Sequence, residues 1–201
     1  NDTIPCSLYH ESVNSIVESS AGRLYVSTYF SLDIFDYEKE EFAHYVFNPS
    51  GQTGGKIISL AEDSRNNIWV ASNLGLMWFD ETHRSFFPYL TAKDIPNRTV
   101  FSVLEDGHDN LWIGTDNGLY QIMKGIFRPP SPDYRVFYSS DGLAGNEFIK
   151  RSAYKNAAGM MFFGSASGYS WFHPDSISVN TDAPPVVLTE FQLMYAQPDK
   201  T

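Results

Sequence analysis

A segment of about twenty residues recurs along this chain, and the repeat constrains the fold more than any other feature. Its clearest copy, residues 102–120, reads SVLEDGHDNLWIGTDNGLY. An alternating apolar run leads into a polar turn at residues 106–110, a β-rich run follows at 111–115, and a second turn lies at 116–118. Two glycine-containing turns at this spacing exclude a helix and predict three short strands.

The copies return at a nearly constant distance. Trp112 stands 43 residues after Trp69, and Tyr25 in a weaker first copy stands 44 residues before Trp69. In a fourth copy Phe162 follows Trp112 by 50 residues, which indicates an insertion between the third and fourth copies. An aromatic segment after each of the first three copies predicts one more strand per unit. Four strands at this period are typical of a β-propeller blade. A β-sandwich gives no reason for four copies of one motif and is disfavoured.

We therefore predict an all-β chain, a partial β-propeller of four four-stranded antiparallel blades within residues 1–180. The blades are expected at about residues 10–47, 56–90, 99–138 and 148–175. Pro184 and Pro185 mark a boundary, because adjacent prolines interrupt a sheet ladder and stiffen a linker. Residues 181–201 are expected to form a linker and the start of a truncated β-sandwich domain, with 186–193 as its first strand.

Charge and composition narrow the classes of function. The formal net charge is −10, which argues against a nucleic-acid partner because phosphate binding needs a basic face. No apolar run of about 18 residues is present, so no membrane-spanning helix is expected. The single Cys6 cannot form a disulfide within the chain.

The repeat resembles the two-component regulator propeller repeat. The third copy fits fully, with Glu105-Asp106, LWIGT at residues 111–115 and NGL at 117–119. The first copy departs in having Ser31 where glycine is expected and Tyr25 in place of tryptophan. The fourth copy departs in having Lys155 in place of glutamate.

The C-terminal part, from Asn146 through FHPD at residues 172–175 to PPVVLT at 184–189, resembles the last propeller blade of hybrid two-component sensors. In those proteins the blade leads into a triple-tyrosine β-sandwich domain. The resemblance implies a periplasmic ectodomain of an inner-membrane histidine kinase of Bacteroidetes. It further implies a response to oligosaccharides from complex carbohydrates and control of polysaccharide-utilisation genes. The kinase is expected outside these 201 residues, so the chain is predicted not to be an enzyme and to reach the membrane only through its parent.

Adjacent carboxylates in the repeat, Glu62-Asp63 and Glu105-Asp106, invite an acid–base interpretation. Neighbouring residues of a strand point to opposite faces, so the members of each pair do not converge. We expect the aspartates to cap the turns that follow them. No catalytic set, metal site or cofactor is predicted. The histidines lack metal-ligand spacing: His10, His44, His83, His108 and His173. Two rival readings stay open, a propeller glycosidase or lyase and a protein-interaction scaffold.

An oligosaccharide site should lie on loops at one end of the propeller. Polar loop residues next to the aromatic Phe101 and Phe148 are the candidates for ligand binding: Asn97, Arg98, Asn146, Glu147 and Arg151.

The repeat also predicts packing and assembly. Trp69, Trp112 and Phe162 should be buried at equivalent places in successive blades. An open arc of four blades should leave its two end faces uncovered. We expect Val13, Ile16 and Tyr25 on the first of these faces, and Tyr154, Phe162 and Phe163 on the second. We therefore predict a homo-oligomer, in the form of a dimer that closes the propeller.

Overall fold

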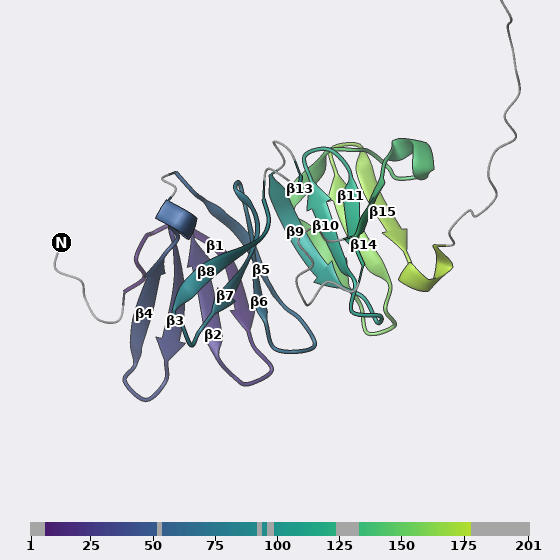
Figure 1. Cartoon of the computed structure of the whole chain (residues 1–201). Helices are drawn as coiled ribbons and strands as arrows, with labels where there is room; N and C mark the ends of the chain where they lie inside the picture. Colours follow the sequence, from purple (N-terminus) through teal and green to yellow (C-terminus); the bar gives the residue numbers. More distant parts are fainter. Residues whose placement is uncertain (1–6, 52–53, 92–93, 96–98, 124–132, 178–201) are drawn as a thin grey trace, which may run out of the picture.

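The computed structural model describes residues 7–51, 54–91, 94–95, 99–123 and 133–177. Within them, fifteen strands form four antiparallel sheets, each made of strands consecutive in the chain (Figure 1). The described residues contain no α-helix and three 3-10 helices, η1 (Pro49–Gly51), η2 (Ser139–Asp141) and η3 (Pro174–Ser176). The prediction of an all-β partial propeller of four antiparallel blades is confirmed.

The first blade comprises β1 (Val13–Glu18), β2 (Leu24–Thr28), β3 (Ser31–Asp36) and β4 (Glu41–Val46). The second comprises β5 (Ile57–Glu62), β6 (Ile68–Ser72), β7 (Gly75–Asp80) and β8 (Ser85–Leu90). The third comprises β9 (Val100–Glu105), β10 (Leu111–Thr115), β11 (Leu119–Ile122) and β12 (Tyr134–Phe137). The fourth comprises β13 (Phe148–Lys155), β14 (Met161–Ser165) and β15 (Gly168–Phe172).

The fourth blade differs from the prediction of four strands, because only three of its strands lie in the described part of the chain. The segment 186–193, predicted as the first strand of a β-sandwich, lies outside the described residues. In the described structure, β15 therefore pairs with β14 alone.

The first strands of successive blades lie next to one another. Contacts join β1 to β5, β5 to β9, and β9 to β13. Serine hydroxyls connect these strands: Leu60 N donates to Ser15 Oγ at 3.2 Å, and Ser59 Oγ donates to the Phe101 carbonyl at 3.0 Å. This arrangement aligns the blades face to face, so that each sheet buries its apolar faces against its neighbours.

Three apolar clusters fill the spaces between successive blades. Trp69 packs between blades two and three, and the fully buried Trp112 packs between blades three and four. The predicted burial of both tryptophans is confirmed. The prediction for Phe162 is wrong, because this side chain is only half-buried. Phe162 occupies the same register position as Trp112, opposite Tyr154 as Trp112 is opposite Leu104, but no described blade follows to cover it.

The two end faces are partly as predicted. Val13 and Ile16 on blade one and Tyr154 on blade four are exposed. Tyr25 and Phe163, which the sequence predicts on these faces, are instead buried between blades. Strand alternation explains both errors, because these two side chains point from their sheets toward a neighbouring blade.

Each aspartate of the Glu-Asp pairs caps the turn that follows it, as predicted. Asp106 accepts hydrogen bonds from His108 N at 2.8 Å, Asn110 N at 2.9 Å and the Trp112 indole N–H at 2.9 Å. Asp63 repeats the arrangement and accepts the indole N–H of Trp69 at 2.8 Å. Burial by itself would raise the pKa of Asp106, but the bonds from Trp112, Asn110 and the turn bring that pKa below its ordinary value of 3.8.

The glutamates of the same pairs bind the preceding blade, a role that the sequence did not reveal. Glu62 Oε2 accepts from Ser20 N of blade one at 2.8 Å. Glu105 Oε2 accepts from Ser64 N of blade two at 2.6 Å. In blade four Lys155 replaces the glutamate, and its Nζ donates to the Glu105 carbonyl at 2.7 Å. In each pair, the aspartate thus stabilises the turn that follows it, and the glutamate stabilises the junction with the preceding blade.

The cap predicts a stability effect. Replacing Asp106 by Ala leaves the Trp112 indole and Asn110 without their acceptor, which should lower the free energy of unfolding by about 3 kcal/mol. Asp36→Ala removes an aspartate from an exposed turn and is the matched control. Urea unfolding followed by tryptophan fluorescence measures both. Equal loss in the two variants would contradict the role of the buried cap.

The lowered pKa of Asp106 predicts a pH dependence. A carboxyl whose pKa is lower in the folded state stabilises that state fully above its unfolded-state pKa, and this contribution is lost as pH falls through the folded-state pKa. The stability difference between the wild type and Asp106→Asn should therefore shrink as pH falls below 3.8, the ordinary value. Chemical denaturation at a series of pH values tests this. A difference that stays constant down to acid unfolding would contradict it.

Candidate functional site

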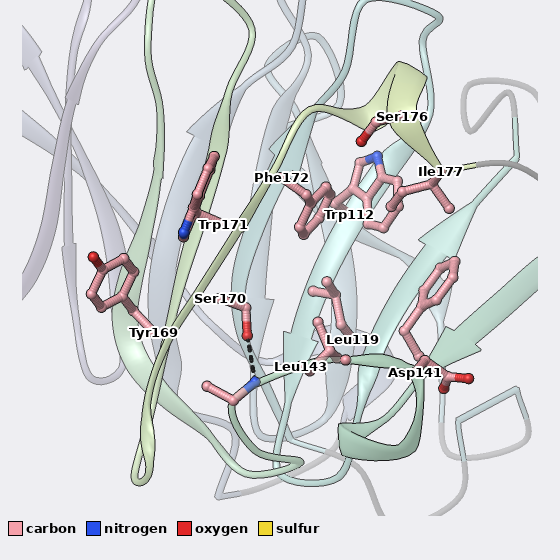
Figure 2. Close-up of a pocket in the computed structure, with 13 residues that line it drawn as sticks. Trp112, Leu119, Asp141, Leu143, Tyr169, Ser170, Trp171, Phe172, Ser176 and Ile177 are labelled. Atoms are coloured by element: carbon pink, nitrogen blue, oxygen red, sulfur yellow. Dashed lines mark hydrogen bonds between the residues drawn. The ribbon is translucent and has the colours of Figure 1, made fainter.

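A cavity of about 590 Å³ lies between blades three and four, beside the open edge of β15 (Figure 2). Its apolar and aromatic lining comes mainly from seven side chains: Trp112, Leu119, Phe137, Leu143, Tyr169, Trp171 and Phe172. Its polar lining includes Asp141, Ser170 and Ser176.

Packed aromatic rings form the floor of this cavity. Trp112 on β10 stacks on Phe137 with ring centroids 5.6 Å apart and contacts Phe172 on β15 at 4.9 Å. The hydrogen bond to Asp106 holds the indole in place from its polar end. Trp112 is fully buried, so it shapes the floor but offers no ring face to a ligand.

The open side of the cavity lies along one edge of β15. In blades one to three the third strand pairs with a fourth, as β11 pairs with β12. Within the described residues no strand pairs with the outer edge of β15, which leaves main-chain N–H and C=O groups along that edge. Tyr169 and Trp171 point away from Phe172 and Trp112, because side chains alternate along the strand (Figure 2).

The connection between blades three and four forms the opposite wall. Asp141 Oδ2 accepts from Tyr138 N at 2.8 Å, which anchors this exposed carboxylate at the end of η2. Ala144 N donates to Ser170 Oγ at 2.9 Å and ties the connection to β15 (Figure 2). The wall is therefore fixed at both ends, and the arrangement can hold an elongated molecule with an apolar side and a hydrogen-bonding side.

Of the residues predicted from sequence to bind a ligand, the three that the structure describes, Asn146, Glu147 and Arg151, are not among those that line this cavity. Asn97 and Arg98 lie outside the described residues. Asn146 has a structural place, since its Oδ1 accepts Ser139 N at 2.6 Å and its carbonyl accepts Gly118 N at 2.7 Å.

The other two candidates are exposed and lie apart from the cavity as well. Glu147 is exposed in the connection that leads into β13. Arg151, in an irregular part of β13 with a φ of 60°, donates from Nη1 to the Asn14 carbonyl of blade one at 3.0 Å. The structure thus separates Asn146 and Glu147 from Arg151 by function: the first two belong to a blade connection, and Arg151 bridges two blades.

Sequence reasoning missed the cavity because its floor is made of residues that read as blade core. The signal that could have located it is the passage from Phe172 directly into His173-Pro174, where the other copies continue toward a fourth strand. Over the described parts of the chain, no group of three acidic, histidine or cysteine side chains could hold a metal ion. The helices described there are all too short to cross a membrane.

Comparisons with known proteins agree with this architecture. Residues 51–74 and 94–117 match the family profile described as two component regulator propeller. A protein named histidine kinase P4 from Formosa agariphila is 27% identical over 157 residues, which cover 78% of this chain and 8% of that protein.

Two solved structures share the fold. An extracellular domain attributed to a hybrid two-component system of B. thetaiotaomicron superposes with a TM-score of 0.70 at 21% identity, covering 87% of this chain and 23% of that one. A second extracellular domain attributed to such a system in the same organism gives a TM-score of 0.67 at 21% identity, covering 82% and 22%.

The protein is thus a β-propeller of antiparallel meander blades joined by carboxylate-capped turns. Two of its segments, residues 51–74 and 94–117, are similar to the two component regulator propeller repeat. The chain spans less than a quarter of each extracellular domain and a small fraction of the histidine kinase.

The structural place of Asn146 can be tested directly. Asn146→Ala removes the acceptor for Ser139 N and should lower the free energy of unfolding by about 1 kcal/mol. Glu147→Ala, at the next and equally exposed position, should leave stability unchanged and serves as the control. Denaturant unfolding of both variants makes the comparison. If Asn146→Ala is as stable as the control, the residue is free for another role.

Proposed function

We propose that this chain is the extracytoplasmic ligand-sensing part of a hybrid two-component sensor histidine kinase. It responds to oligosaccharides from complex carbohydrates and controls polysaccharide-utilisation genes through its parent protein. The location is the periplasm, as part of the ectodomain of an inner-membrane protein. The observation that carries the proposal is the joint occurrence of regulator propeller repeats with similarity to extracellular domains and to a histidine kinase.

The chemistry of the cavity supports a sugar ligand. A volume of about 590 Å³ is that of an ordinary small-ligand site. The C–H faces of a sugar can pack on Phe172, Phe137 and Leu143, while its hydroxyls can bond to Asp141 and to the free edge of β15. The net charge of −10 disfavours an anionic ligand, so neutral oligosaccharides suit this chain better than sulfated or uronic ones.

The place of the cavity suggests how binding is transmitted. A ligand there contacts the connection after blade three and the last described strand of blade four together. Ligand binding would favour the conformation in which this connection and β15 lie close enough to contact the ligand together. Since β15 and η3 lead toward the C-terminal end of the chain, a shift in their position is passed to whatever follows in the parent.

Binding is tested by closing the cavity mouth. Ala144 lines the cavity and is exposed, so Ala144→Trp should fill the opening without disturbing the core. Ala158→Trp, in an exposed turn of blade four, is the matched control. The wild type and the control should show a thermal shift with a neutral oligosaccharide from a screened set, and Ala144→Trp should not. Binding unchanged in Ala144→Trp would place the site elsewhere, and no shift with any neutral oligosaccharide would contradict the ligand class.

The proposal includes that the chain does not cleave its ligand. The carboxylates most open to a catalytic reading, Glu62 and Glu105, hold serine N–H groups of the preceding blade. Incubation with polysaccharides should therefore release no reducing ends. Steady release that disappears in Glu105→Gln would instead support the rival interpretation as a propeller glycosidase.

A further inference from the structure

A second cavity, of about 690 Å³, lies at the junction of blades one and two. Part of its lining comes from two hairpin turns, that between β3 and β4 in blade one and that between β7 and β8 in blade two: Tyr37, Glu38, Lys39, Glu81, Thr82 and Arg84. Both walls belong to described blades of this chain, so the cavity does not depend on what precedes blade one or follows blade four.

The cavity has room because blade one carries small side chains where blade two carries an aromatic pair. Ile34 and Ala43 face each other across β3 and β4, in the register that Trp78 and Phe87 have across β7 and β8. Trp78 and Phe87 stack with ring centroids 5.2 Å apart, and Trp78 packs against the cluster between blades two and three. Ile34 and Ala43 instead line an open space.

Two polar departures of blade one from the repeat lead to the same cavity. The Arg23 carbonyl accepts the N–H of the residue that caps its turn at 2.8 Å, as the Asn67 carbonyl does at 3.1 Å, so the two positions are equivalent. The Asn67 side chain binds the cap of its own blade, whereas the Arg23 guanidinium pairs with Glu81 of blade two. The Tyr25 hydroxyl, in place of an indole, also donates to Glu81. Residues that order the turn in blade two are thus replaced by residues that reach a wall of the cavity.

Most of the charged side chains in the lining neutralise one another. Lys39 binds Asp36 at 3.0 Å, and Asp36 also accepts two main-chain N–H groups of its own turn. Glu81 pairs with Arg23 of the neighbouring blade. These two ion pairs contribute no net charge to the cavity.

One acidic and one basic side chain of the lining remain available, and they come from different blades. Glu38 stands in the turn of blade one and Arg84 in the turn of blade two, and both are exposed. Among the residues that the structure describes, neither side chain takes part in an ion pair or a hydrogen bond. Apolar side chains lie in the same lining, including Ile34 and Tyr45. The cavity therefore offers a negative charge, a positive charge and an apolar surface together.

We propose that this cavity binds a short zwitterionic peptide with an aromatic or aliphatic side chain. The peptide carboxylate pairs with the Arg84 guanidinium, whose two parallel N–H groups match a carboxylate, and the peptide ammonium pairs with Glu38. The apolar side chain packs on Ile34 and Tyr45. Such a ligand carries no net charge, which suits both the balanced lining and the net charge of −10. This inference does not rest on the proposed function, because it concerns another cavity and another class of ligand.

Calorimetric titration of the whole chain tests the class of ligand. Alanyl-phenylalanine and alanyl-leucine supply one side chain of each type, and at least one of these dipeptides should bind at millimolar concentration. The N-acetylated form of that dipeptide lacks the ammonium, and its C-terminal amide lacks the carboxylate. Each blocked form should bind about tenfold more weakly than the free dipeptide. No binding of either dipeptide, or equal binding of a blocked form, would overturn the proposal.

Filling the space locates the site. Ala43→Phe introduces the residue type that blade two has at this position and should abolish dipeptide binding, while the exposure of Ala43 lets the fold persist. Ala158→Phe, in an exposed turn of blade four, is the matched control. Ala144→Trp closes the cavity at β15 and should still bind the dipeptide, so this proposal and the proposed function can fail separately. Circular dichroism confirms the fold of each variant. Unchanged binding by Ala43→Phe would overturn the proposal.

Single charge changes assign the two ends of the ligand. Glu38→Gln should weaken dipeptide binding about tenfold and remove the preference over the N-acetylated form. Arg84→Gln should have the same effect relative to the amide form. Glu41→Gln changes an exposed carboxylate of β4 outside the lining and should leave binding unchanged. Equal losses in Glu38→Gln and Glu41→Gln, or preferences that persist in both lining variants, would contradict the proposed pairing.

Discussion

The structure depends on one recurring pair of adjacent carboxylates. Because neighbouring side chains of a strand point to opposite faces, Asp106 turns into its own blade and Glu105 toward the preceding one. The aspartate orders the turn and fixes the Trp112 indole, while the glutamate holds Ser64 of blade two. The pair resembles a catalytic acid–base pair, but its two carboxylates accept structural hydrogen bonds. Each copy of the pair joins one more blade to the arc.

The cavity and the exposed aromatic face of blade four lie on the same strand, β15. Internal blades cover their tryptophans and pair their third strands, whereas the described part of blade four has neither a following blade nor a fourth strand. Because no described blade follows, Tyr169 and Trp171 are exposed. Because no described strand pairs with the outer edge of β15, that edge is open beside Phe172. Tyr169, Trp171 and Phe172 of this strand all take part in lining the candidate cavity.

What the sequence determined by itself was local: strands, turns and the aspartate caps follow from alternation and turn chemistry within about twenty residues, so the four-bladed fold was predictable. The tertiary structure decided everything that depends on a neighbouring blade. Tyr25 and Phe163 are buried while Phe162 is not, although all three are aromatic residues of equivalent strands. The glutamate junctions and the cavity also belong to this second group. The physical reason is that a strand pattern specifies two faces of a sheet, but only packing specifies what lies against each face.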